Sequence, residues 1–89
     1  MEKSKSWYEH IGRCLGQAIV SRRKRLNMSQ EDLAEKSGVD RAFISSIERS
    51  KRNPSFKTMA SIAHGLRMRF ARLVDNSERC ADDKARKAQ

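Results

Sequence analysis

The chain has 89 residues, the length of one small domain. One proline, four glycines and many Ala, Leu, Lys, Arg, Glu, Gln and Met residues favour helices and argue against an all-β fold, whose turns need more chain-breaking residues. Residues 1–74 hold 16 bases and 7 acids, which accounts for the whole net charge of +9. A unit this basic attracts polyanions, and nucleic acid is the leading candidate, ahead of an anionic membrane surface or an acidic protein.

The two cysteines and two histidines are too dispersed for a metal site. Cys14 and Cys80 form no CxxC pair, and neither His10 nor His64 is near them in sequence. There is no apolar leader and no apolar run of membrane-spanning length. We therefore expect a cytoplasmic protein without metal or other cofactor. Its thiols should stay reduced, with Cys14 half-buried on a helix and Cys80 idle in a C-terminal tail.

We expect a flexible N-terminus at residues 1–8, and a first helix whose pattern becomes visible from about Trp7. Its apolar residues recur at spacings of three and four, which is the pattern of one helix face: Ile11, Leu15, Ala18, Ile19 and Leu26. Gly12 and Gly16 interrupt this helix, and either mark close packing against a second helix or carry no meaning. Asn27 is a plausible end, because asparagine tolerates the left-handed conformation that closes helices.

Two short helices should follow, with almost no chain between them. Ser29 and Asp32 can form a variant of the capping box at the start of the first, and Gly38 closes it after about two turns. Asp40 can cap the second, in which Ile44 and Ile47 face the core and which ends at about Arg49. Isolated helices this short are unstable in water, so the pair must dock against the rest of the chain.

The remaining segments predict a fourth helix and a weakly marked fifth one. Ser55 can cap the fourth helix after the polar turn at residues 50–54, and Gly65 ends or weakens it. The apolar residues between Met68 and Val74 suggest a short fifth helix. From Asp75 apolar residues become rare, so we expect residues 76–89 to be a disordered polar tail after a folded domain at residues 9–75.

The segment from Ser29 to Arg49 resembles the helix-turn-helix of the Cro and lambda-repressor-like (XRE) family. The similarity rests on residues that match together: Gln30, Ala34, Gly38, Val39, Ile44, Ile47 and Glu48. Residues 51–55 resemble the loop that follows in that family, and DRAFISSIERSKRN is similar to restriction–modification controller proteins. The resemblance spans residues 11–74 and implies a compact, all-α, five-helix domain. Ser50 departs from it, since the family usually has glycine there.

The resemblance implies a division of labour on double-stranded DNA. Base edges would be contacted from the third helix by Arg41, Ala42, Ser45 and Ser46. Phosphates would be held by Gln30, Phe43, Arg49, Lys51, Arg52 and Asn53. Arg23 and Glu48 match a family salt bridge between the first and third helices. We expect this pair to orient the third helix more than it stabilises the fold.

A homodimer on a two-fold-symmetric operator is expected, because one such domain reads too few bases for high specificity. The apolar seam would consist of Leu66, Met68, Phe70, Leu73 and Val74. This predicts a transcriptional regulator, with autoregulation or the control of a restriction–modification system as its open roles. We expect no membrane partner and no small-molecule ligand. The alternative is an antitoxin that masks a toxin through residues 75–89. An enzyme has little support, because the sequence shows no catalytic constellation.

Overall fold

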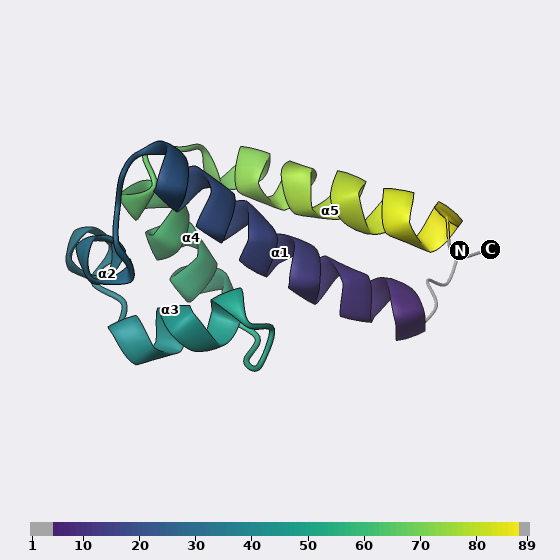
Figure 1. Cartoon of the computed structure of the whole chain (residues 1–89), viewed down its shortest axis with the longest axis horizontal. Coiled ribbons are helices and arrows are strands. Elements are labelled where there is room, and N and C mark those ends of the chain that lie inside the picture. Colours follow the sequence, from purple (N-terminus) through teal and green to yellow (C-terminus); the bar gives the residue numbers. More distant parts are fainter. Residues whose placement is uncertain (1–4, 88–89) are drawn as a thin grey trace.

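The computed structural model describes residues 5–87, which form five helices and no strand (Figure 1). The helices are α1 (Lys5–Arg25), α2 (Gln30–Ser37), α3 (Arg41–Glu48), α4 (Phe56–Gly65) and α5 (Phe70–Lys87). The all-α, five-helix expectation is therefore confirmed. The predictions for residues 1–4 and 88–89 lie outside the described residues, whereas residues 5–8 belong to α1 rather than to a flexible terminus.

The helix ends follow the capping residues of the sequence. Ser29 and Asp32 form a complete capping box on α2, and the bonds from Ser29 hold the pKa of the Asp32 carboxyl below its usual value. Asp40 accepts from the backbone of Ala42 at the start of α3, and Ser55 from that of Thr58 at the start of α4. Gly38 has φ of 74°, which lets the chain turn from α2 to α3 within three residues.

Three further turns use left-handed residues that are not glycine. Asn27 has φ of 57°, as its position at the end of the first helix predicts. Ser50, where the family usually has glycine, has φ of 58°, so the turn keeps the left-handed conformation with a side chain that costs about 1 kcal/mol. Arg67 adopts the same conformation between α4 and α5, two residues beyond Gly65.

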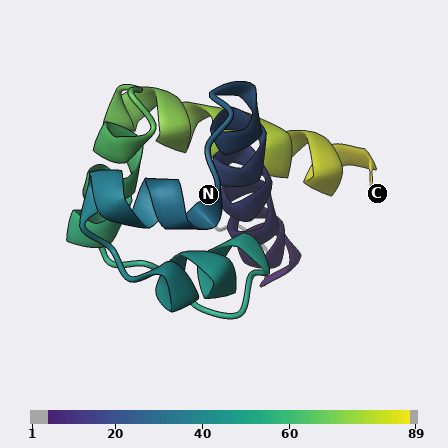
Figure 2. The same ribbon diagram turned by 60° about the vertical axis from the view of Figure 1, so that its left-hand side comes forward.

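One core joins all five helices. Its fully buried side chains include Ile19 of α1, Leu33 of α2, Ile44 and Ile47 of α3, Ile62 of α4, and Leu66 and Leu73 around the start of α5. Figure 2 shows α2 lying above α3, joined to it by their short connection. Each short helix therefore persists because its one apolar face is buried against the others.

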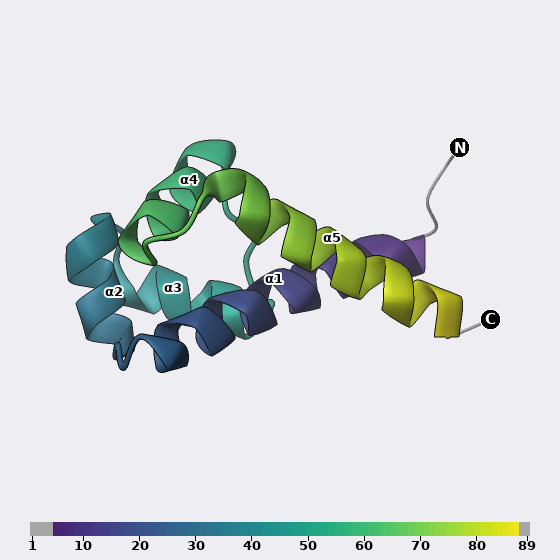
Figure 3. The same cartoon turned by 90° about the horizontal axis from the view of Figure 1, so that it is seen from above.

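The longest contact runs between α1 and α5, which lie side by side and antiparallel (Figures 1 and 3). Helix α5 has 18 residues, so the prediction of a disordered tail is wrong for residues 76–87. The core stripe of this helix continues past Leu73 with the small buried residues Ser77 and Ala81. Small residues allow α5 to approach α1 closely, and composition alone does not reveal them as core.

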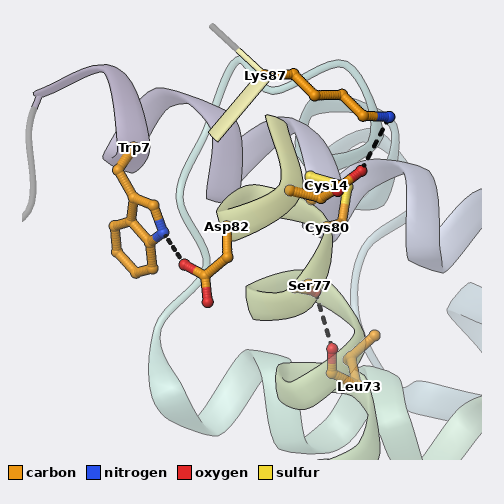
Figure 4. The surroundings of a disulfide bond; sticks show 8 residues. Trp7, Cys14, Leu73, Ser77, Cys80, Asp82 and Lys87 are labelled. Carbon is orange, nitrogen blue, oxygen red and sulfur yellow. Dashed lines mark hydrogen bonds and ion pairs between the residues drawn. A yellow bond between two sulfur atoms is a disulfide. The ribbon is translucent and has the colours of Figure 1, made fainter. Parts of the chain in front are cut away.

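A disulfide between Cys14 and Cys80 joins the two long helices (Figure 4). The expectation of reduced thiols and an idle Cys80 is thus wrong.

Beyond the disulfide, the indole N–H of Trp7 donates to Asp82 at 2.6 Å, which is a second contact from α1 to α5. The ion pairs of Asp83 with Arg86 and Lys87 lie on the exposed surface and contribute little, although Arg86 first and then Lys87 keep the pKa of Asp83 below its usual value. The disulfide and the Trp7–Asp82 hydrogen bond therefore both hold the C-terminal part of α5 to α1.

Cys80→Ala should destabilise the protein by roughly 2–4 kcal/mol, because a closed loop of this size restricts the unfolded chain. Trypsin should then cut after Lys84, since the last turns of α5 bury little apolar surface. Urea denaturation with and without a thiol reductant measures the loss. Reductant should lower the urea concentration at which the parent protein unfolds and leave that of the variant unchanged. A parent protein insensitive to reductant would contradict the structural role of the disulfide.

Candidate DNA interface

The position of α3 is set first by a close approach to α1. A Cβ atom on Gly16 would lie 2.7 Å from the carbonyl oxygen of Glu48 and 2.9 Å from that of Ile47. Real Cβ atoms do not approach backbone that closely, so only glycine allows the end of α3 to rest on α1. Gly12 has nothing within 4 Å of the same position. Of the two meanings that the sequence left open, close packing holds for Gly16, and Gly12 shows no such contact.

An ion pair then holds the end of α3. Arg23 donates to both carboxylate oxygens of Glu48, at 2.9 and 3.0 Å, and also to the carbonyl oxygen of Met28 at 2.9 Å. The two side chains are only 11% and 5% exposed, so the pair is more buried than expected. Removing one partner would leave a charge without compensation in the interior, which is costly. The pair therefore contributes to folding as well as to orientation.

Gln30 extends this network to the exposed face of α3. Its amide donates to Glu48 at 2.9 Å, and its carbonyl oxygen accepts from Arg41 at 3.4 Å. One hydrogen of the Gln30 amide remains for a further acceptor. The family resemblance implies that a DNA phosphate is that acceptor. The geometry adds that Gln30 links the buried pair to the first residue of α3.

The four residues predicted to contact bases lie on one side of α3. Arg41 and Ala42 are exposed, and Ser45 and Ser46 are partly so. They lie opposite Ile44 and Ile47, which are buried. The hydroxyl of Ser46 donates to the carbonyl oxygen of Ala42 at 3.0 Å, which satisfies its proton and leaves its lone pairs outward. A small, uncluttered face with one arginine at its start can enter a DNA groove closely.

Positive side chains flank this face at the C-terminal end of α3. The guanidinium of Arg52 lies over the ring of Phe43, 5.9 Å from its centroid, and the Arg49 side chain donates to the carbonyl oxygen of Ser45 at 3.3 Å. Phe43 is partly buried against the core, so it acts as a platform for Arg52. The structure brings the remaining predicted phosphate contacts, Lys51 and Asn53, to the exposed loop beside them.

The predicted dimer seam is only partly available. Leu66 and Leu73 are 0% exposed and belong to the core of the protomer, so they cannot contact a second copy. Met68, Phe70 and Val74 remain partly exposed. Phe70 packs edge-to-face on Phe56, with ring centroids 4.9 Å apart, and Phe56 is 72% exposed. The sequence pattern could not separate buried from partly exposed apolar residues, because both kinds occur close together between Leu66 and Val74.

Arg22 has a structural role that the sequence did not reveal. Its guanidinium donates to the carbonyl oxygens of Leu66 at 2.9 Å and Arg67 at 3.0 Å, so it ties the end of α1 to the end of α4. The run of four basic residues at 22–25 is typical of a solvated helix end. The family resemblance implied the pairing of Arg23 with Glu48, but only the fold shows that Arg22 binds backbone carbonyl groups.

Two short helices joined by a tight turn, with the second exposed beside positive side chains, define the helix-turn-helix class of DNA-binding domains. The family model described as helix-turn-helix matches residues 19–73. The chain belongs to this XRE-type helix-turn-helix family.

Its relatives and structural neighbours are regulators. The control protein C.SmaI of Serratia marcescens is 38% identical over 64 residues, which cover 72% of this chain and 76% of that protein. The immunity repressor of Bacillus phage phi105 is 31% identical over 71 residues, covering 80% of this chain. The match spans only 49% of the repressor.

A solved structure of the restriction–modification controller protein C.Esp1396I, as a tetramer with its natural 35-base-pair operator, is 34% identical with a TM-score of 0.68. It covers 76% of this chain and 93% of that one. No helix formed by residues 5–87 is long and apolar enough to cross a membrane, and the same residues contain no cluster of three or more His, Cys, Asp or Glu that could hold a metal ion.

Gly16→Ala should destabilise the protein by about 1–3 kcal/mol, because the added methyl group overlaps the carbonyl groups of α3. Gly12→Ala is the matched control. It should stabilise α1 by about 0.5–1 kcal/mol, since alanine is the better helix former and meets open space. Urea denaturation compares the two variants. Equal stabilisation of both would show that α3 does not rest on Gly16.

Proposed function

We propose that the protein is a sequence-specific DNA-binding transcriptional regulator that binds a two-fold-symmetric operator as a homodimer. The observation that carries this proposal is the exposed face of α3. It presents Arg41, Ala42, Ser45 and Ser46 together, and the network of Gln30, Glu48 and Arg23 holds it rigidly. The net charge of +9 supplies the attraction to DNA that does not depend on sequence.

Helix α3 would enter the major groove, with Arg41 at its start contacting guanine O6 and N7 and Ala42 contacting a thymine methyl group. Arg41 would leave its long hydrogen bond with the Gln30 carbonyl oxygen, and the remaining hydrogen of the Gln30 amide would donate to a phosphate. Arg52, held over Phe43, would contact phosphate on the far side together with Arg49, Lys51 and Asn53. The cytoplasm, where such a regulator meets its DNA, is the expected location.

The similarity to C.SmaI and C.Esp1396I favours a restriction–modification controller that acts on the promoter of its own operon. The antitoxin alternative required residues 75–89 as a free segment for masking a toxin. Residues up to Lys87 instead form a helix bonded to α1, which weakens that alternative.

The dimer would form through the apolar patch of Phe56, Phe70 and Val74, which lies on the flank of α5 next to α4. An exposed aromatic pair beside a partly exposed valine is typical of an interface core. This patch retains Phe70 and Val74 from the sequence prediction and replaces the buried leucines with Phe56.

Operator selection followed by binding measurements on Arg41→Ala and Arg52→Ala would test the DNA contacts. Arg41→Ala should weaken the selected site by about 1–3 kcal/mol and leave affinity for unrelated DNA nearly intact. Arg52→Ala should weaken binding to all DNA about equally. It should also reduce the slope of log affinity against log salt concentration by about one. Identical behaviour of the two variants would refute the division between base and phosphate contacts. Failure to select any preferred site at ~150 mM salt would refute the proposed function.

Phe56→Glu should convert the dimer to a monomer in sedimentation velocity, because a carboxylate would be buried in the apolar interface. Tyr8→Glu is the control, since Tyr8 is, among residues 7–87, the other large apolar side chain with high exposure, 60% against 72% for Phe56. The Tyr8 variant should sediment like the parent protein. A Phe56→Glu protein that stays dimeric would place the interface elsewhere.

A further inference from the structure

A cleft of about 560 Å³ separates the C-terminal half of α1 from the start of α5, and no residue of α2 or α3 lines it. Five arginines line it: Arg22, Arg25, Arg67, Arg69 and Arg72. The other lining residues are neutral, namely Cys14, Gln17, Ala18, Ser21, Met68, Asn76 and Cys80. Five positive charges without an acidic residue among them repel one another. An anion bound in the cleft would offset this repulsion, so its binding would be favourable.

The arginines of this cleft are not used by the fold, except for Arg22. Arg22 is fixed by its bonds to the backbone of residues 66 and 67, so its guanidinium holds one wall of the cleft in place. Among residues 5–87, the other four cleft arginines form no ion pair, and all four are exposed. Four free guanidinium groups around one hollow can bind phosphate oxygens in pairs.

The backbone adds to the positive potential. Helix α5 begins at Phe70, between Arg69 and Arg72, and its first turn has no acidic residue. The N-terminus of a helix carries a partial positive charge and free N–H groups, both of which favour an anion. The start of α5 therefore adds partial positive charge next to Arg69 and Arg72, which line the cleft.

The cleft lies on the side of α1 away from α3. Cys14 and Ser21 line it, whereas Gly16 and Arg23, two positions further along each time, contact Glu48 of α3. Two residues advance a helix by rather more than half a turn. Cys14 and Ser21 therefore project to one side of α1, and Gly16 and Arg23 to the opposite side. Operator DNA held by α3 is thus separated from the cleft by the width of α1.

The cleft is also separate from the apolar patch. Arg72 and Asn76 line the cleft, whereas Val74, midway between them, projects to the other flank of α5. A dimer formed through Phe56, Phe70 and Val74 would therefore leave the cleft open. Its volume lies in the range of pockets for small molecules, and a duplex is too wide to enter a hollow of that size.

We propose that this cleft binds a small ligand that carries a chain of two or more phosphates. Several arginines spread along a hollow match a row of phosphates better than a single anion, because each phosphate can accept a bidentate pair. Ala18 and Met68 provide apolar surface beside the charges, which suits a nucleotide as well as an inorganic oligophosphate. The site was not foreseen from the sequence, because its arginines come from segments more than 40 residues apart.

Calorimetric titration of the full oxidised chain with inorganic tripolyphosphate at ~150 mM salt tests the site. Saturation at one ligand per protomer is expected. Arg69→Ala combined with Arg72→Ala should weaken binding about tenfold or more, since each removes charge-assisted hydrogen bonds. Arg13→Ala combined with Lys57→Ala removes the same charge from exposed positions outside the cleft and should change affinity less than about twofold. Circular dichroism confirms that both double variants fold.

Parallel titrations with orthophosphate and adenosine triphosphate identify the ligand. If adenosine triphosphate binds more tightly than tripolyphosphate, the natural ligand is a nucleotide. If the two bind equally, the natural ligand is an inorganic phosphate chain. Orthophosphate as strong as tripolyphosphate, binding that does not saturate, or equal losses in the two double variants would each overturn the proposal. Loss of operator affinity in the Arg69 and Arg72 variant, together with competition by unrelated duplex DNA, would show a DNA surface instead. Operator binding by the parent protein is measured separately, so neither result decides the other.

Discussion

The ion pair between Arg23 and Glu48 is the interaction on which the exposed face of α3 depends. It joins α1 to α3 through two hydrogen bonds, and Gln30 adds a third from α2. Because both charges are largely buried, their positions are narrowly defined and the loss of either would be costly. Gly16 sets the distance at which the pair forms, since a side chain there would push α3 away from α1. A helix of eight residues with little stability of its own is thereby held as a rigid surface.

Helix α1 is the scaffold for the contacts that hold α3, the end of α4 and α5. One side of α1 places Gly16 and Arg23 against α3. The Arg22 guanidinium holds the end of α4 by donating to the backbone carbonyl oxygens of residues 66 and 67. The opposite side carries Cys14, which binds α5 covalently. This arrangement places the predicted DNA contacts and the arginine cleft on different sides of one helix. It also explains why a ligand in the cleft would touch the same helix that positions α3, through the adjacent residues Arg22 and Arg23.

The local features of α2 and α3 were predictable, because the residues that decide them are neighbours in sequence. The capping box of Ser29 and Asp32, the positive φ of Gly38 and the cap of Asp40 all act over two to four residues. The fifth helix was misjudged for the opposite reason. Ser77 and Ala81 are core residues only because α1 lies against them. Serine is polar, and few other apolar residues accompany Ala81, so the pattern did not mark this segment as a core helix. Cys80 likewise gains its role from a residue near the other end of the chain.

By itself, the sequence determined the helical class, the limits of the two short helices and the side of α3 that faces outward. Spacing and capping are properties of contiguous residues and need no knowledge of the fold. The tertiary structure alone decided which charged and small residues act inside the protein. It buried the expected pair of Arg23 and Glu48, placed Leu66 and Leu73 in the core instead of an interface, and joined Cys14 to Cys80. These assignments depend on distances between segments far apart in the chain, which arise only when the helices pack.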